Sequence, residues 1–219
     1  MRRSGTLLIA LLLATAAAAG AGDNIKWKRA KNLTYVTPGN ETPSALADPE
    51  EMFEQYTLSW SNPHGKDIYE IVATYVAWDF IYTHLSESFA AGHMDLEEFT
   101  AGLEKGRENF ENKINLLVTV LADEERHARL SNRHYWNVSL QSGVEKFQPS
   151  KIELRESSFE EGLVKSPNET GSGTPIRLSM KTYVVTFDHP YKIHVPASIK
   201  LILLCDDCRR GFEWRFVEE

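Results

Sequence analysis

Apolar side chains in the first half of the chain recur at the spacing of an α-helix. They fall three or four positions apart between residues 66 and 90, and again between residue 95 and about residue 129. Positions three and four apart share one face of a helix, so each series predicts a long helix with an apolar stripe. The Gly92-His93 segment between the two series predicts a short turn, and the helices would then form an antiparallel hairpin.

Residues at the expected helix starts have the chemistry of N-terminal caps. Asp48 can accept hydrogen bonds from unpaired amides, and the proline that follows it suits the first helical position. Asp95 and Glu98 have the spacing of a capping box. These signals predict a helical region over residues 48–134, preceded by an extended, proline-containing arm over residues 22–47.

The period of the pattern changes at Tyr135. From there Trp136, Val138 and Leu140 alternate with polar residues, which is the period of two expected for a half-buried strand. Further strands are predicted over residues 151–156, 176–187, 198–204 and 212–217. Short strands at this spacing indicate an antiparallel β-sandwich-like region over residues 135–219.

Helices first and strands afterwards predict a protein of the α+β class. The expected fold is an N-terminal α-helical hairpin followed by a C-terminal antiparallel β-sandwich-like region. The change of period near residue 134 either separates two domains or lets the hairpin lie across one face of the sheet.

The first 21 residues have the three properties of a cleavable secretory signal peptide. Two arginines give a positive start, the apolar run from Leu7 to Leu13 continues into alanines, and small residues precede a cut after Ala21. The apolar run is shorter than the roughly 20 residues that a membrane-spanning helix needs. We therefore expect a protein exported to the bacterial periplasm or the extracellular space, with a mature chain that begins near Gly22.

The negative net charge of the chain argues against two classes of binding partner. Its 24 basic and 31 acidic residues give a formal net charge of −7, and loss of the two signal-peptide arginines would make it −9. This balance argues against nucleic-acid binding, which needs clustered cations to displace phosphate counterions, and against docking on anionic lipid. Four Asn-x-Ser/Thr sequons would be glycosylated only in a eukaryotic secretory pathway. Their asparagines are Asn32, Asn40, Asn137 and Asn168.

The two cysteines, Cys205 and Cys208, are separated by two aspartates that suit the centre of a β-turn. The end residues of a β-turn approach within about 7 Å, near the upper limit of disulfide geometry. An oxidising compartment favours a closed bond, so we predict a structural disulfide. A redox pair stays open as an alternative, although the motif leads into a strand rather than the helix that would activate a thiolate. A zinc site is a further alternative, although a second pair of ligands is missing.

Glu124 and His127 have the Glu-x-x-His spacing that places a carboxylate and an imidazole on one helix face. A second such motif is absent from the sequence, so we interpret this segment as the solvated, charged end of a helix. His134 would share the same face if the helix extended that far. His189 and His194 lie in an expected turn between strands and are interpreted as surface histidines rather than metal ligands.

No sequence signature names a reaction, since neither a Gly-x-Ser-x-Gly elbow nor a phosphate-binding glycine loop occurs. We therefore assign no catalytic, cofactor-binding or metal-binding residue and no cofactor. The favoured function is a non-enzymatic exported interaction or small-ligand-binding module, whose partner is an unknown protein or small molecule. One alternative is a redox or metal-handling protein centred on Cys205 and Cys208. Others are an extracytoplasmic hydrolase with a scattered site, and a structural subunit that docks through the apolar seam between Leu96 and Leu121.

Overall fold

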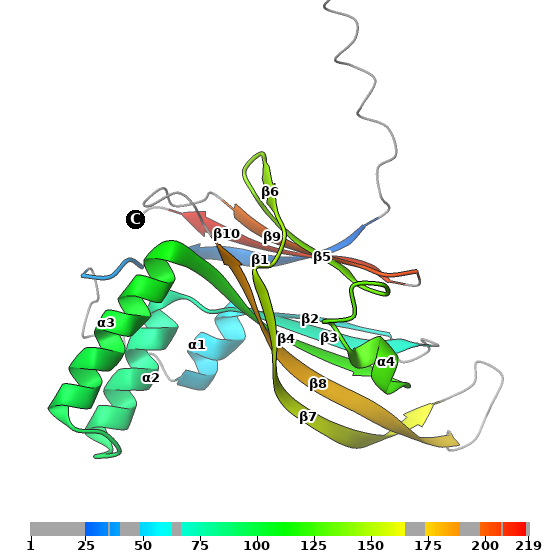
Figure 1. The fold of residues 1–219 in the computed structure, drawn as a ribbon, viewed down its shortest axis with the longest axis horizontal. Coiled ribbons are helices and arrows are strands. Elements are labelled where there is room, and N and C mark those ends of the chain that lie inside the picture. Colours follow the sequence, from blue (N-terminus) through cyan, green and yellow to red (C-terminus); the bar gives the residue numbers. More distant parts are fainter. Residues whose placement is uncertain are drawn as a thin grey trace, which may run out of the picture.

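Two five-stranded sheets face each other as a β-sandwich (Figure 1). The structure is a computed structural model that describes residues 25–34, 36–39, 49–62, 67–164, 174–188, 198–206 and 208–217. Several of the sequence predictions fall outside these residues. They are the signal peptide over residues 1–21, His189 and His194, and the sequon residues Asn40 and Asn168.

The first sheet, sheet A, is built from both ends of the chain. Its strands are β1 (Lys26–Thr34), β5 (Asn137–Ser142), β6 (Glu145–Phe147), β9 (Ser198–Leu204) and β10 (Arg209–Val217). They lie in the order β1-β10-β9-β5-β6. The β1–β10 pair is parallel, and the other pairs in this sheet are antiparallel.

The second sheet, sheet B, is antiparallel throughout. Its strands are β2 (Thr57–Ser61), β3 (Ile68–Tyr75), β4 (Lys113–Ala122), β7 (Lys151–Val164) and β8 (Thr174–Asp188). They lie in the order β2-β3-β4-β8-β7. Because β4 pairs with β8, hydrogen bonds of one sheet cross the boundary predicted near residue 134.

Helices lie at the two ends of the sandwich. They are α1 (Pro49–Tyr56), α2 (Trp78–Ala90), α3 (Leu96–Asn112) and the single-turn α4 (Glu125–Ala128). The first three lie at one end of the sheets and α4 at the other (Figure 1). Asp95 and Glu98 form the predicted capping box at the start of α3. In the part of the chain that the structure describes, no helix is both long enough and apolar enough to cross a membrane.

The predicted fold class is wrong. The protein is mostly β, with 52% of it in strands, and its helices lie in the middle of the chain rather than in an N-terminal hairpin ahead of the sheets. The segment predicted as one helix over residues 66–90 contains β3 followed by α2. The segment predicted as one helix over residues 95–129 contains α3, β4 and α4. The predicted helical region 48–134 therefore contributes three strands of sheet B.

The residues of β4 were predicted as helix because their apolar positions fit both a helical and an alternating pattern. Ile114, Leu117 and Leu121 fit a helical stripe, but a second series alternates and is buried on the core face of the strand. That series is Ile114, Leu116, Val118, Val120 and Ala122. Both patterns are present in the sequence. Hydrogen-bonded pairing of this segment with β3 on one side and β8 on the other selects the strand. The β-branched run at residues 118–120 agrees with the strand.

The predicted extended arm over residues 22–47 contains the edge strand β1. It pairs only with β10 and has few apolar residues, so its sequence lacks a clear alternation. Leu33 nevertheless joins the core at 2% exposure. After residue 135 the predicted strands are found, β9 with the same bounds and the others as parts of longer or shifted strands.

The end of the core next to α1 and α2 is fixed by Tyr56. The Tyr56 hydroxyl donates to Asp79 Oδ2 at 2.7 Å, and the Tyr56 carbonyl accepts the Trp214 Nε1 proton at 2.7 Å. Tyr56 and Trp214 are both fully buried. These two bonds connect the end of α1 to the start of α2 and to strand β10 of sheet A.

Alanine at Gly211 is expected to lower stability, because a Cβ atom there would lie less than 3 Å from three atoms of the Trp27 ring. Overpacking of this kind costs about 1–3 kcal/mol in the free energy of unfolding. The matched control is Gly102→Ala, where the nearest atom is the flexible Cδ2 of Leu85 at 3.1 Å and alanine favours the helix. Chemical denaturation of both variants checks this, and equal losses would contradict it.

Asp79 is expected to make stability fall as pH rises. Burial raises the pKa of the Asp79 carboxyl, and the hydrogen bonds from Tyr56 and the Phe80 amide only partly oppose this. A carboxyl with a raised folded-state pKa adds stability below its unfolded pKa and loses it as pH rises through the folded value. The unfolding free energy of Asp79→Asn relative to wild type should therefore increase between about pH 3 and about pH 7. A constant difference over this range would refute the assignment.

Candidate metal centre

Two aspartates lie opposite each other where β3 begins and β4 ends. Ile68 pairs with Ala122, and the next residues outward are Asp67 and Asp123. The Asp123 amide donates to the Asp67 carbonyl at 3.2 Å, so the antiparallel register continues to this pair. Directly opposed residues of antiparallel strands have Cβ atoms about 4.5–5.5 Å apart. The register of β3 and β4 therefore brings two carboxylates together.

His127 is held beside them by α4. Its amide donates to the Glu124 carbonyl at 3.0 Å, and its carbonyl accepts the Trp136 Nε1 proton at 2.9 Å. Its ring stacks on Tyr135, with centroids 5.0 Å apart and an interplanar angle of 26°. His127 is 7% exposed. The imidazole therefore has a fixed position at the end of sheet B.

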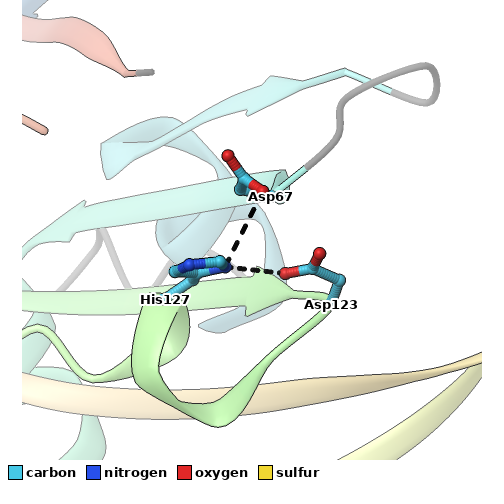
Figure 2. Close-up of side chains that lie close together, drawn as sticks. All are labelled: Asp67, Asp123 and His127. Carbon is cyan, nitrogen blue, oxygen red and sulfur yellow. Dashed lines mark hydrogen bonds and ion pairs between the residues drawn. The ribbon is translucent and has the colours of Figure 1, made fainter. Parts of the chain in front are cut away.

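The three side chains converge on one point (Figure 2). His127 Nδ1 lies 2.8 Å from Asp123 Oδ1 and 4.0 Å from Asp67 Oδ1. Ligand atoms from all three residues lie within 4.8 Å of one another. The two carboxylates are more exposed than the imidazole, at 27% and 30% of their side-chain surface against 8%. No other group of three or more His, Cys, Asp or Glu in the described ranges is close enough to share an ion.

The hydrogen bonds of the His127 ring favour one tautomer of the imidazole. Arg126 Nε lies 3.1 Å from His127 Nε2 and also 2.7 Å from Glu124 Oε2. A guanidinium can only donate, so Nε2 acts as the acceptor and Nδ1 carries the proton that is donated to Asp123. Asp123 Oδ1 accepts a second bond, from the Glu124 amide at 2.6 Å. A metal ion at Nδ1 would move this proton to Nε2, which would then no longer accept from Arg126.

The site has negative potential. No lysine or arginine among the described residues forms an ion pair with Asp67 or Asp123. Burial raises the pKa of the neighbouring Tyr69 phenol, and the charges of Asp123 and Asp67 raise it further. The negative charges of Asp67 and Asp123 therefore add up in the same small region, and no described lysine or arginine neutralises them through an ion pair.

The Glu124–His127 spacing noted in the sequence overlaps this group only at His127. Glu124 is exposed and faces Arg126, and it takes no part in the group around His127. The interpretation of His127 as a solvated residue is wrong, because α4 is a single helical turn and the buried imidazole stacks on Tyr135. His134 is exposed and lies outside the group. Asp67 carries no local signal, since only the pairing of β3 with β4 brings it to Asp123.

Cys205 and Cys208 lie where β9 turns into β10. The amide of each donates to the carbonyl of the other, at 2.7 and 3.3 Å. No disulfide joins them in the structure. Hydrogen-bonded pairs of this kind have Cα atoms about 5.5 Å apart, within the disulfide range, so the predicted bond stays a prediction. The two thiols belong to no cluster of three or more metal-ligating residues in the part of the chain described.

A shallow groove of about 610 Å³ borders the site on the Arg126 side. It is lined by Glu125, Arg126, Arg129, Ser131 and Asn132. Glu125 in its lining pairs with Lys181, a buried residue of β8 whose Nζ lies 3.1 Å from Glu125 Oε1. Glu125 also accepts from Arg129 at 3.0 Å, and these two cations hold the pKa of its carboxyl below the ordinary value. The groove therefore has a defined shape next to the imidazole.

No protein-family model, curated protein or solved structure matches this chain. Function is therefore inferred from the chemistry of the site. Two carboxylate oxygens and an imidazole nitrogen form a donor set suited to divalent transition metals.

Removal of one aspartate should stabilise the metal-free protein, and removal of the other should destabilise it. Asp67→Asn relieves the repulsion of an opposed like-charge pair and should raise the free energy of unfolding by about 0.2–1 kcal/mol. Asp123→Ala leaves the His127 Nδ1 proton and the Glu124 amide without their acceptor and should cost about 1–3 kcal/mol. Denaturant unfolding in the presence of a chelator measures both values. A loss for Asp67→Asn as large as that for Asp123→Ala would contradict the repulsion.

Proposed function

We propose that the protein is an exported, non-enzymatic binding module that holds a divalent transition-metal ion at Asp67, Asp123 and His127. Zn²⁺ represents this class of ion. The observation that carries the proposal is the pair of opposed carboxylates with a buried imidazole against them. The location outside the cytoplasm rests on the sequence of the first 21 residues.

The opposed aspartates are difficult to explain as structural residues alone. Like charges directly opposite each other on neighbouring strands are destabilising. Asp123 has a structural role, because it accepts bonds from His127 and from the Glu124 amide. Asp67 has none of these bonds, and its oxygen lies 4.0 Å from His127 Nδ1. A bound cation would turn this repulsion into attraction to a shared charge.

The distances are compatible with one ion after a small movement. Zn²⁺ binds imidazole nitrogen at about 2.0–2.1 Å and carboxylate oxygen at about 2.0–2.2 Å, so two donors on one ion lie at most about 4.4 Å apart and roughly 3.4 Å apart in a tetrahedral site. The Asp67–His127 separation of 4.0 Å is already within that limit. The donor atoms all lie within 4.8 Å of one another, and side-chain rotation of the half-exposed aspartates closes the difference.

The donor set selects a class of metal. Calcium and magnesium prefer six or more oxygen ligands, whereas an imidazole nitrogen with two carboxylates suits zinc and neighbouring first-row ions. Three protein ligands leave further coordination positions for water or a small anionic ligand.

Titration with Zn²⁺ should show one high-affinity site per chain. At a free concentration of about 100 times Kd, the ion should raise the free energy of unfolding by about 2.7 kcal/mol. His127→Gln and Asp67→Asn should each weaken binding by at least about tenfold, since each removes one of three ligands. His134→Gln is the matched control, because it removes an exposed histidine outside the group. Calorimetry and metal-dependent thermal shifts measure these effects.

The same titration tests the role of Nδ1. Because the ion would occupy Nδ1 and the single ring proton would move to Nε2, ¹⁵N NMR of the His127 imidazole should show the proton-bearing nitrogen change from Nδ1 to Nε2 as Zn²⁺ is added. Two results would overturn the proposal. One is that His134→Gln weakens Zn²⁺ binding as much as His127→Gln does, and the other is that the wild-type protein binds no Zn²⁺.

A further inference from the structure

One row of polar side chains crosses all five strands on a single face of sheet A. Register pairs Arg29 of β1 with Glu213 of β10, and Glu213 with Lys200 of β9. The row continues through Gln141 of β5 to Lys146 of β6. Phe212 and Trp214, which flank Glu213 in the chain, are in the core, so this row lies on the outer face. With strands about 4.8 Å apart, the row is roughly 19 Å long.

Glu213 holds the cations of this face in fixed positions. Its side chain is only 4% exposed, and its carboxylate lies 2.8 Å from Arg29 Nε, 3.3 Å from an Arg215 terminal nitrogen and 3.5 Å from Lys200 Nζ. Burial raises the pKa of Glu213, but the hydrogen bond from Arg215 and the charges of Lys200, Arg215 and Arg29 outweigh it and hold the pKa below the ordinary value. The carboxylate therefore stays ionised and organises three cations around it.

One carboxylate neutralises only one of these cations. Arg29, Lys200 and Arg215 keep 58%, 31% and 47% of their side-chain surface exposed. Lys146 is exposed in the same row. Four cations against one carboxylate give this set a net charge of +3, in a chain whose formal charge is −7. The outer face of sheet A therefore carries the sign opposite to that of the whole chain.

An aromatic ring lies beside the cations. Trp27 pairs with Gly211, and its ring covers the place where a Cβ would stand. Lys200 Nζ lies 5.7 Å from the centroid of that ring, and Trp27 keeps part of its surface exposed. A flat aromatic ring packs against the C–H face of a pyranose, while neighbouring cations meet acidic groups on the same sugar.

We propose that the outer face of sheet A binds a linear acidic polysaccharide that carries carboxylate or sulfate groups. Three of the four cations lie in one line across the strands, with Arg215 two residues along β10 from Glu213, and a line of this kind fits an extended polymer better than a planar membrane. Among the described strand residues of sheet A, Val217 is the one large apolar side chain that is exposed. A bilayer would have little apolar side chain to accept there, whereas a hydrated polymer needs none.

The test measures binding to polygalacturonate and to dextran sulfate, with uncharged dextran as the reference polymer. The variant is Lys146→Glu with Lys200→Gln, which leaves Arg29 and Arg215 to hold Glu213. The matched control is Lys105→Glu with Arg107→Gln, which makes the same change of net charge on the exposed surface of α3. Lys146→Glu alone is a further variant, since Lys146 lies in the hairpin away from Glu213.

We expect the acidic polymers to bind at low salt and to dissociate as salt increases, with no binding of uncharged dextran. The double variant of sheet A should bind about tenfold more weakly, the single variant should fall between, and the control should stay within about twofold of wild type. Three outcomes would overturn the proposal. They are no binding of either acidic polymer, equal weakening by the control pair, and tighter binding to phosphatidylglycerol vesicles or duplex DNA than to the polysaccharides.

Discussion

The antiparallel pairing of β3 with β4 is the constraint on which the rest of the structure depends. In the chain, β3 and β4 come before and after the inserted helices α2 and α3. The other edge of β4 then pairs with β8. Its register also sets Asp67 opposite Asp123, so the same hydrogen bonds that build sheet B create the charged pair at its end. A shift by one residue would turn one aspartate to the opposite face and separate the two carboxylates. The fold and the candidate metal centre therefore have a common origin.

Structural features that depend on residues close together in the chain were predicted from the sequence. The capping box at Asp95 and the alternating strand β9 are both visible without knowledge of their neighbours in space. β3 and β4 were missed because apolar residues in a two-sided, mostly buried strand also satisfy helical spacing. β1 was missed because an edge strand has little alternation to detect. In each case the deciding information is the identity of the partner strand, which lies far away in the chain.

The residues of the two proposed sites were also not predicted from the sequence, because strand pairing brings together residues that no local motif connects. A search for contiguous motifs found Glu124 and His127, but the carboxylates next to the imidazole are Asp123 and the distant Asp67. The formal net charge of −7 argued against anionic partners, yet pairing of the N-terminal strand β1 with the C-terminal strands β10 and β9 gathers cations from both ends of the chain around Glu213. Composition describes the average surface, whereas binding depends on which charges the sheet places side by side.

The proposed metal centre consists of a fixed imidazole, an opposed pair of carboxylates and an ion that would relieve their repulsion. The most direct measurement is anomalous diffraction at the zinc absorption edge from crystals grown with Zn²⁺. For the proposed centre we expect one strong peak per chain, about 2.0–2.2 Å from His127 Nδ1 and from one oxygen each of Asp67 and Asp123. A peak at Cys205 and Cys208 instead, or no peak beside His127, would contradict it.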